Sequence, residues 1–139
     1  MSFVKRVVLD TSTLVSAALR VESVPSRAFL KALGSCEVCA SEETARELDE
    51  VLSRPKFDRY LDRTERTAFV ELFETYATKF EVHESVDDCR DPKDNKFLAL
   101  AISCAADVLV ASDQDLIALH PYRGIPIVTP TDFLAFEVI

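Results

Sequence analysis

The chain has 139 residues, of which 48 % are hydrophobic, so we expect one compact domain over residues 1–139. Its 24 acidic residues against 16 Lys and Arg give a net charge of −8, which excludes a protein that coats nucleic acid by neutralising phosphates over its whole surface. An enzyme that binds nucleic acid locally is not excluded. No apolar run reaches the ~18 residues of a membrane span, and the start of the chain lacks a signal-peptide pattern. We therefore expect a cytoplasmic protein that binds no membrane.

The first expected strand covers residues 3–9 and ends directly in Asp10. Helices are expected at 12–20 and 26–34, the second stopped by Gly34. In sheets of α/β proteins, sites form beyond the carboxyl ends of the strands. Asp10 is therefore a candidate site residue, and capping of the next helix is the alternative role.

The second expected strand, at residues 35–40, contains a pair of cysteines with the spacing of a zinc knuckle. Residues three apart in a strand face opposite sides, and the other two cysteines, Cys89 and Cys104, form no second such pair. We expect all four thiols to be reduced and mostly buried. The histidines, His83 and His120, are expected at the surface.

Two amphipathic helices follow, at 41–54 and 63–80, the first beginning at an N-cap, Ser41. Glu47 lies at the edge of the apolar stripe of the first helix, one turn before Val51. From the residues alone, an exposed surface glutamate is the favoured interpretation. The second helix repeats aromatic and aliphatic residues at helical spacing, which core packing explains by default and a protein interface explains as an alternative.

The next helix is expected at 94–106 and is opened by Asp94. Helical spacing aligns this carboxylate with the stripe that should be buried, formed by Leu98, Ala101 and Ala105. An N-cap is the alternative. Asp91 is near enough to assist, although its position before Pro92 favours the start of a turn.

The remaining strands are expected at 106–112 and 125–130, and the first of them leads into Asp113. Strands alternating with helices predict an α/β fold with a parallel sheet covered on both faces. Two buried strands that each end in Asp bring carboxylates together if the strands are neighbours. Grouped carboxylates are stable when protonated or bridged by a cation, so the pattern predicts a cation site.

Five segments, in this order and spacing, resemble the PIN domain family, especially small prokaryotic toxins of toxin–antitoxin pairs. They are VVLDTSTLVSA, ARELDEVLSRPKF, DPKDNKFLALA, VLVASDQDL and IPIVTPTDFL, and they cover nearly the whole chain. The resemblance implies a single-domain α/β/α sandwich with a Rossmann-like parallel sheet. It also implies a metal-dependent endoribonuclease that hydrolyses RNA phosphodiester bonds with one or two Mg²⁺ or Mn²⁺ ions.

The resemblance assigns catalytic roles to four acids of this chain, Asp10, Glu47, Asp94 and Asp113. We expect the principal ion on Asp10, Asp94 and Asp113, with Asp115 at the place of an additional acid found in many members. Hard cations such as Mg²⁺ and Mn²⁺ prefer such oxygen ligands. Neighbouring polar side chains are expected to orient the acids or a metal-bound water: Thr11, Ser12, Asn95 and Ser112.

The chain departs from the family pattern at two positions. Many relatives have Asn in place of Ser12. Many also have Thr or Ser two residues before the fourth acid, where this chain has Ala111 and the hydroxyl follows at Ser112. These departures concern side chains that orient the acids, and the four acids themselves are present.

Cations beside the acids are candidates for holding an RNA substrate: Arg46, Lys93 and Lys96. The segment RPKFDRYLDRTER, residues 54–66, adds more cations interleaved with Phe57 and Tyr60, which is compatible with a surface that contacts RNA or an antitoxin. Because acids are interspersed from Asp58 onward, a solvated face of alternating charge is the favoured interpretation.

The resemblance also implies a homodimer and a cognate antitoxin as partners. Two other classes share part of the first motif. Adhesion domains of the von Willebrand factor A type would need a serine at Leu14, and a phosphotransferase of the haloacid dehalogenase type would need an Asp at Ser12. The alternative that stays open is a PIN-fold domain of weak activity that acts mainly by binding protein or RNA.

Overall fold

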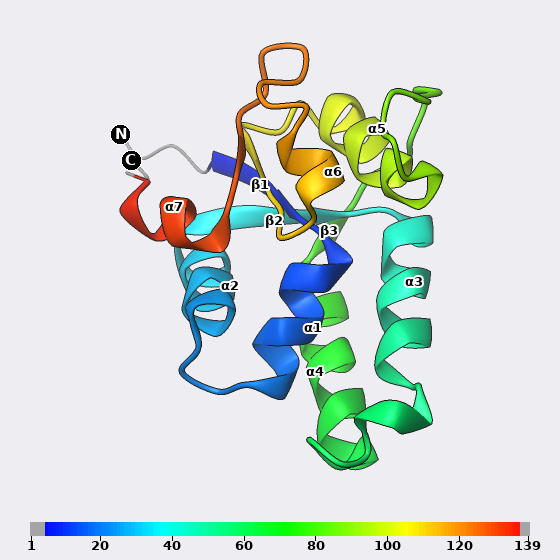
Figure 1. Cartoon of the computed structure of the whole chain (residues 1–139), viewed down its shortest axis with the longest axis vertical. Coiled ribbons are helices and arrows are strands. Elements are labelled where there is room, and N and C mark those ends of the chain that lie inside the picture. Colours follow the sequence, from blue (N-terminus) through cyan, green and yellow to red (C-terminus); the bar gives the residue numbers. More distant parts are fainter. Residues whose placement is uncertain (1–4, 137–139) are drawn as a thin grey trace.

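The computed structural model describes residues 5–136 and places a parallel sheet between two layers of helices (Figure 1). The five strands lie in the order β3-β2-β1-β4-β5, and every pairing is parallel. Their bounds are Lys5–Leu9 (β1), Cys36–Ala40 (β2), Thr78–Lys79 (β3), Val108–Val110 (β4) and Ile127–Val128 (β5). The predicted α/β/α sandwich is therefore confirmed; residues 3 and 4 of the first expected strand lie outside the described residues.

Seven α-helices and two 3₁₀ turns complete the described part of the chain. Their bounds are Thr11–Leu19 (α1), Val24–Ser35 (α2), Glu42–Leu52 (α3), Pro55–Phe57 (η1), Arg63–Tyr76 (α4), Pro92–Asp94 (η2), Asn95–Ser103 (α5), Gln114–Ile117 (α6) and Pro130–Ala135 (α7). One core joins α1, α2, α3, α4 and α7 to one face of the sheet, and the other joins α5 and α6 to the opposite face (Figure 1). No helix between residues 5 and 136 combines the length and the apolar character needed to cross a bilayer.

The strand order reverses at β1, which pairs with β2 on one side and β4 on the other. Val7 and Val8 of this central strand are completely buried. A crevice forms beyond the carboxyl ends of the strands at such a reversal. Asp10 follows β1 and Asp113 lies three residues after β4, so the topology brings the two predicted strand-end acids to one place.

The expected helix 63–80 is too long, because α4 ends at Tyr76. Thr78 and Lys79 instead form β3, where they pair with Cys39 and Ala40 of β2. Helical periodicity continues through this segment in the sequence, but pairing with the sheet edge determines its conformation. Two apolar positions of the predicted stripe are also exposed, Leu72 (39 %) and Tyr76 (63 %).

The bounds of α2, α3 and α5 also differ from the sequence prediction. Helix α2 starts earlier, at the N-cap Ser23, and ends at Ser35, so Gly34 lies inside its last turn and does not stop it. Helix α3 ends at Leu52, and the proline three residues later opens η1. Ala105 lies beyond α5, is exposed and has φ of 52°, so it does not belong to the buried stripe of Leu98 and Ala101.

All four cysteines are free thiols, as predicted; three are buried and Cys36 is half-buried. Cys39 and Cys104 lie in the core between the sheet and α5. The interaction with the neighbouring Cys104 thiol, followed by burial, raises the pKa of Cys39.

Candidate metal centre

A cleft of about 400 Å³ lies where β1 and β4 end, between α1, α3 and η2. We call it the metal cleft. Its polar walls are Asp10, Thr11, Ser12, Ser16, Glu47, Arg54, Asp91, Lys93, Asp94 and Asp113, with Val15, Val51 and Phe57 beside them. The four acids assigned by the resemblance all lie in this one cleft.

Asp10 is 2 % exposed and connects two parts of the backbone. As the N-cap of α1, its Oδ1 accepts from the N–H of Thr13 at 2.9 Å. Its Oδ2 accepts from the N–H groups of Ser112 and Asp113, at 3.0 and 3.3 Å. Burial raises the pKa of Asp10, and these donors act in the opposite direction because they stabilise the carboxylate. Both oxygens are thus occupied by the protein itself.

Asp94 differs from Asp10 because its side chain caps no helix. It stands at the N-cap position of α5 without a capping hydrogen bond. Its Oδ2 is buried and has no hydrogen-bond partner among the described residues. Burial, followed by the adjacent Asp113 carboxylate, raises the pKa of Asp94 to about 7. A buried oxygen without a donor is a position that a cation would stabilise.

Three carboxylates converge beside this unpartnered oxygen. Asp91, Asp94 and Asp113 each offer an oxygen, and these atoms lie within 4.8 Å of one another. Asp113 caps α6, accepting from the Asp115 N–H at 2.8 Å. A compact, all-oxygen donor set of this kind fits a hard divalent cation such as Mg²⁺ or Mn²⁺.

This group differs in part from the metal ligands expected from the sequence. Asp94 and Asp113 belong to it, whereas Asp10 and Asp115 lie outside it. Asp91 takes the third place. It was expected to begin a turn, and it does so as the N-cap of η2, accepting from the Lys93 N–H at 3.1 Å. The Asp-Pro-x-Asp spacing is the sequence signal for its second role, because a tight turn brings both carboxylates to the same side.

Each carboxylate oxygen of Glu47 contacts another side chain. The exposed surface glutamate that the sequence favours at this position is therefore not what the structure has. Thr11 Oγ1 donates to Glu47 Oε1 at 2.5 Å, and Lys96 Nζ pairs with Glu47 Oε2 at 2.5 Å. The side chains of Lys96 and Glu47 are only 11 % and 22 % exposed. Lys96 Nζ also donates to the carbonyl of Lys93 at 2.7 Å. Lys96 therefore links α3 to the turn that carries Asp91 and Asp94.

The four polar residues expected to orient the acids divide into two sets. Thr11 contacts Glu47, Ser12 is exposed on the wall of the cleft, and Ser112 Oγ lies 2.8 Å from Thr13 Oγ1. Asn95 instead turns away from the cleft, where its Oδ1 accepts from the Cys89 N–H at 2.8 Å. Asn95 thereby fixes the loop before Asp91.

The three cations expected to hold RNA have different surroundings. Lys93 is exposed and lines the metal cleft. Lys96 is mostly buried in its pair with Glu47. Arg46 lies outside the cleft wall, where it pairs with Glu42 at 3.6 Å. Arg54, one of the cations of the 54–66 segment, lines the cleft instead.

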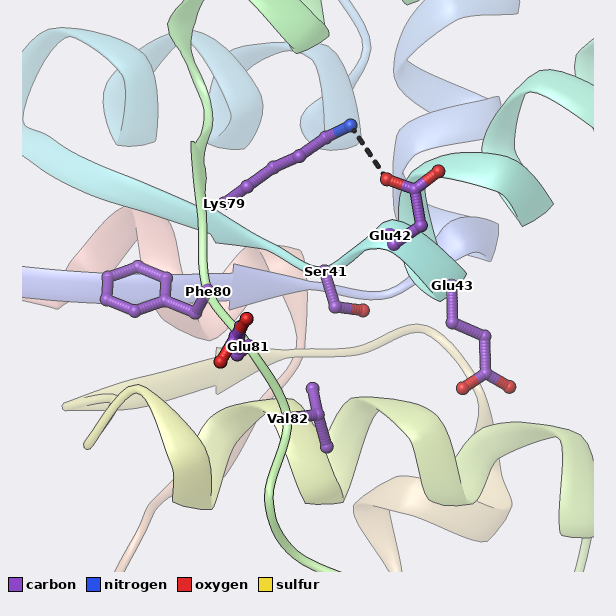
Figure 2. Close-up of a pocket in the computed structure, with 7 residues that line it drawn as sticks. All are labelled: Ser41, Glu42, Glu43, Lys79, Phe80, Glu81 and Val82. Carbon is purple, nitrogen blue, oxygen red and sulfur yellow. Dashed lines mark hydrogen bonds and ion pairs between the residues drawn. The ribbon is translucent and has the colours of Figure 1, made fainter.

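A second pocket lies at the ends of β2 and β3 (Figure 2). It is lined by Ser41, Glu42, Glu43, Lys79, Phe80, Glu81 and Val82, and we call it the Ser41 pocket. Lys79 reaches across it to Glu42, with 3.3 Å between Nζ and Oε2 (Figure 2). Its three glutamates are all exposed, so it has acidic side chains but no group of converging carboxylates.

The sequence model of the PIN domain family matches residues 6–115, which include every acid of the metal cleft. The chain belongs to the PIN domain family. PIN domains are nucleases as a family and typically bind a divalent metal. The carboxylate group of this PIN domain has the ligand chemistry that such an ion requires.

Proteins similar to this PIN domain in sequence or in fold include one sequence relative and two solved structures. The uncharacterized protein MJ1680 of Methanocaldococcus jannaschii is 26 % identical over 118 residues, which are 83 % of this chain and 75 % of that protein. PAE2754 from Pyrobaculum aerophilum has a similar crystal structure, with a TM-score of 0.64 at 16 % identity over 96 % of this chain and all of that one.

A third similar fold is a chain of VapBC2 from Rickettsia felis, solved bound to a DNA fragment from their promoter. It matches with a TM-score of 0.61 at 11 % identity over 89 % of this chain and 98 % of that chain. At these identities the two solved structures establish the shared fold. The PIN fold of this chain is thus supported by the family match and by both structures.

Proposed function

We propose that this PIN domain is a metal-dependent endoribonuclease that hydrolyses RNA phosphodiester bonds in the metal cleft. The observation that carries the proposal is the convergence of Asp91, Asp94 and Asp113 around a buried Asp94 oxygen that has no protein donor. Its ion would be Mg²⁺ or Mn²⁺, held by Asp94 and Asp113 with Asp91 beside them. When bound, such an ion lowers the pKa of a water and stabilises charge on a phosphate.

The other cleft residues organise this centre. Asp10 fixes the backbone of Ser112 and Asp113 through its Oδ2, and so positions the Asp113 carboxylate. Glu47, fixed by Thr11 and Lys96, presents a carboxylate that orients an attacking water by accepting its hydrogen bond. Asp115 remains a proposed additional acid.

We further propose that the protein is the toxin of a toxin–antitoxin pair, acts in the cytoplasm and forms a homodimer. Support comes from the family match and from the shared fold with a chain of VapBC2. The second candidate is a weakly active PIN domain that works mainly by binding. It is favoured by the protein contacts that each carboxylate oxygen of Asp10 and of Glu47 already makes.

The proposal is tested by cleavage of labelled single-stranded RNA with Mn²⁺, Mg²⁺ or a chelator. The variant of choice is Asp94→Asn, because this carboxylate caps nothing and its loss leaves the backbone bonds intact. Asp49→Asn, an exposed change on α3, is the matched control. We expect metal-dependent cleavage by the wild type and the control and none by Asp94→Asn.

The sequence suggests Asp10→Asn as a variant that removes charge while leaving the fold intact. The structure corrects this expectation. Both Asp10 oxygens accept from backbone N–H groups, so the amide nitrogen of an asparagine would face a backbone donor at either position. Cleavage that persists in Asp94→Asn would contradict the assigned site, and absence of cleavage by the wild type on a panel of RNAs would favour the binding domain.

A further inference from the structure

Another groove continues from the metal cleft along α1 toward the segment that joins α3 to α4. The two cavities share Val15, Ser16 and Phe57. The groove has a volume of about 530 Å³, and its far walls are the end of α1, Pro25 and Tyr60. We call it the aromatic groove.

Two aromatic rings form one side of this groove, and a cation lies near the face of each ring. Phe57 is half-buried at the junction with the metal cleft, and Tyr60 is 59 % exposed. Lys56 Nζ lies 5.1 Å from the centre of the Phe57 ring, and the Arg59 guanidinium lies 5.3 Å from the centre of the Tyr60 ring. Aromatic faces beside cations are the combination that binds single-stranded nucleic acid.

Two acids of this segment are engaged elsewhere than with Lys56 and Arg59. Asp58 pairs with the buried Arg66 at 2.6 Å, and Asp62 caps α4 by accepting from the Glu65 N–H at 3.1 Å. Among residues 5–136, no ion pair engages Lys56, Arg59 or Arg20, the last of which lies on the opposite wall of the groove. Within this segment Asp58 and Asp62 are therefore engaged in contacts of the protein, whereas Lys56 and Arg59 form no ion pair among the described residues.

We propose that the aromatic groove is a subsite for single-stranded RNA. It takes an unpaired base of the strand whose phosphate lies in the metal cleft. Tyr60 supplies the stacking surface, and Lys56, Arg59 and Arg20 contact the adjoining phosphates. A base already paired in a duplex has no free face for Tyr60, so the subsite selects unpaired RNA. This proposal names the substrate of the cleft and rests on the proposed function.

The test measures binding of a fluorescent 12-nucleotide single-stranded RNA by anisotropy, in full-length Asp94→Asn protein with Mg²⁺ so that the RNA stays intact. Adding Tyr60→Ala should weaken binding by about tenfold, the scale of one lost base-stacking contact. Tyr60→Phe keeps the ring and should restore binding. The matched control is Tyr76→Ala, which removes a tyrosine of similar exposure, 63 %, outside both cavities and should change binding less than twofold.

Two variants that each remove one lysine charge, and an RNA duplex, complete the test. Lys56→Gln should weaken binding and its salt dependence, whereas Lys79→Gln in the Ser41 pocket should do neither. An RNA duplex of the same sequence should bind Tyr60→Ala and its parent equally. Equal binding of single-stranded RNA by Tyr60→Ala and its parent overturns the subsite, and is the result expected if the groove takes a protein segment instead.

The outcome separates this proposal from the proposed function. If the wild type cleaves no RNA but its affinity for single-stranded RNA depends on Tyr60, the subsite is supported and the proposed nuclease activity is contradicted. If the wild type cleaves RNA in a metal-dependent way and Tyr60→Ala has an unchanged KM, the nuclease activity is supported and the subsite is contradicted.

Discussion

The metal cleft and the Ser41 pocket occupy equivalent places, since each lies where parallel strands end and a helix begins. They differ in how their acids are held. In the metal cleft the helix caps are themselves carboxylates, Asp10 and Asp113. In the Ser41 pocket the cap is a neutral hydroxyl, Ser41, in a reciprocal capping box with Thr44, and the glutamates around it are exposed.

This difference shows that the edge of a parallel sheet is not sufficient for a metal centre. Glu42 of the Ser41 pocket is 71 % exposed and pairs with Lys79 and Arg46, so water and cations already compensate its charge. Asp94 has neither compensation, because its Oδ2 is buried and Asp113 lies beside it. The folded metal cleft thus retains negative charge that a cation would neutralise.

The largest stability difference is expected between the two kinds of cap. Asp10→Asn places an amide nitrogen against at least one backbone donor in either orientation of the amide, and should destabilise the protein by about 1–3 kcal/mol. Ser41→Ala removes one neutral cap and should cost about 1 kcal/mol. Urea denaturation of both variants measures the difference, and equal losses would show that Asp10 acts only as an ordinary cap.

A smaller difference is expected between the two lysine–glutamate pairs. Lys96→Met leaves the mostly buried Glu47 without its cation and should destabilise by about 1–2 kcal/mol. Lys79→Met removes an exposed pair, with side chains 49 % and 71 % exposed, and should cost less than about 0.5 kcal/mol. Thermal unfolding of the two variants measures both losses of stability. A loss for Lys79→Met as large as that for Lys96→Met would contradict the structural role given to Lys96.

The smallest expected effect is a pH dependence in the absence of metal. The pKa of Asp94 is raised from 3.8 to about 7 in the folded protein. Between these values the folded state holds a proton that the unfolded state has released, so stability falls as the pH rises. After allowance for screening by solvent, we expect a loss of about 1 kcal/mol between pH 4 and pH 8.

This loss should be absent in Asp94→Asn and should be removed by Mn²⁺, which compensates the ionised carboxylate. Glu43→Gln, in the Ser41 pocket, should leave the pH dependence as it is in the wild type. Denaturant unfolding at several pH values, with and without metal, gives the comparison. A wild type and an Asp94→Asn variant with parallel pH profiles would exclude Asp94 as the source.

The sequence predicts most of the fold and the place of the site, because strand-end acids and helical periodicity are local signals. Asp10, Asp94 and Asp113 are recognisable for this reason. Helix α4 is overpredicted because the pairing of Thr78 and Lys79 with β2 is a long-range interaction without a local pattern. Tertiary contacts override local propensity in such short segments.

The details of the candidate site depend on side-chain contacts that no spacing rule gives. An N-cap was a plausible role for both Asp10 and Asp94, yet only Asp10 forms the capping bond. Lys96 has the sequence context of a substrate-binding cation, and its packing against Glu47 is visible only in three dimensions. Arg66 is a second cation whose burial and pairing with Asp58 are visible only in three dimensions.

The most direct test of the account is a titration of the metal-free protein with Mn²⁺, followed by calorimetry or by electron paramagnetic resonance. The wild type and Glu43→Gln should bind Mn²⁺ with the same affinity, and Asp94→Asn should bind at least about tenfold more weakly. Equal affinity of Asp94→Asn and the wild type, or a wild type that binds no Mn²⁺, would contradict the assignment of the metal cleft.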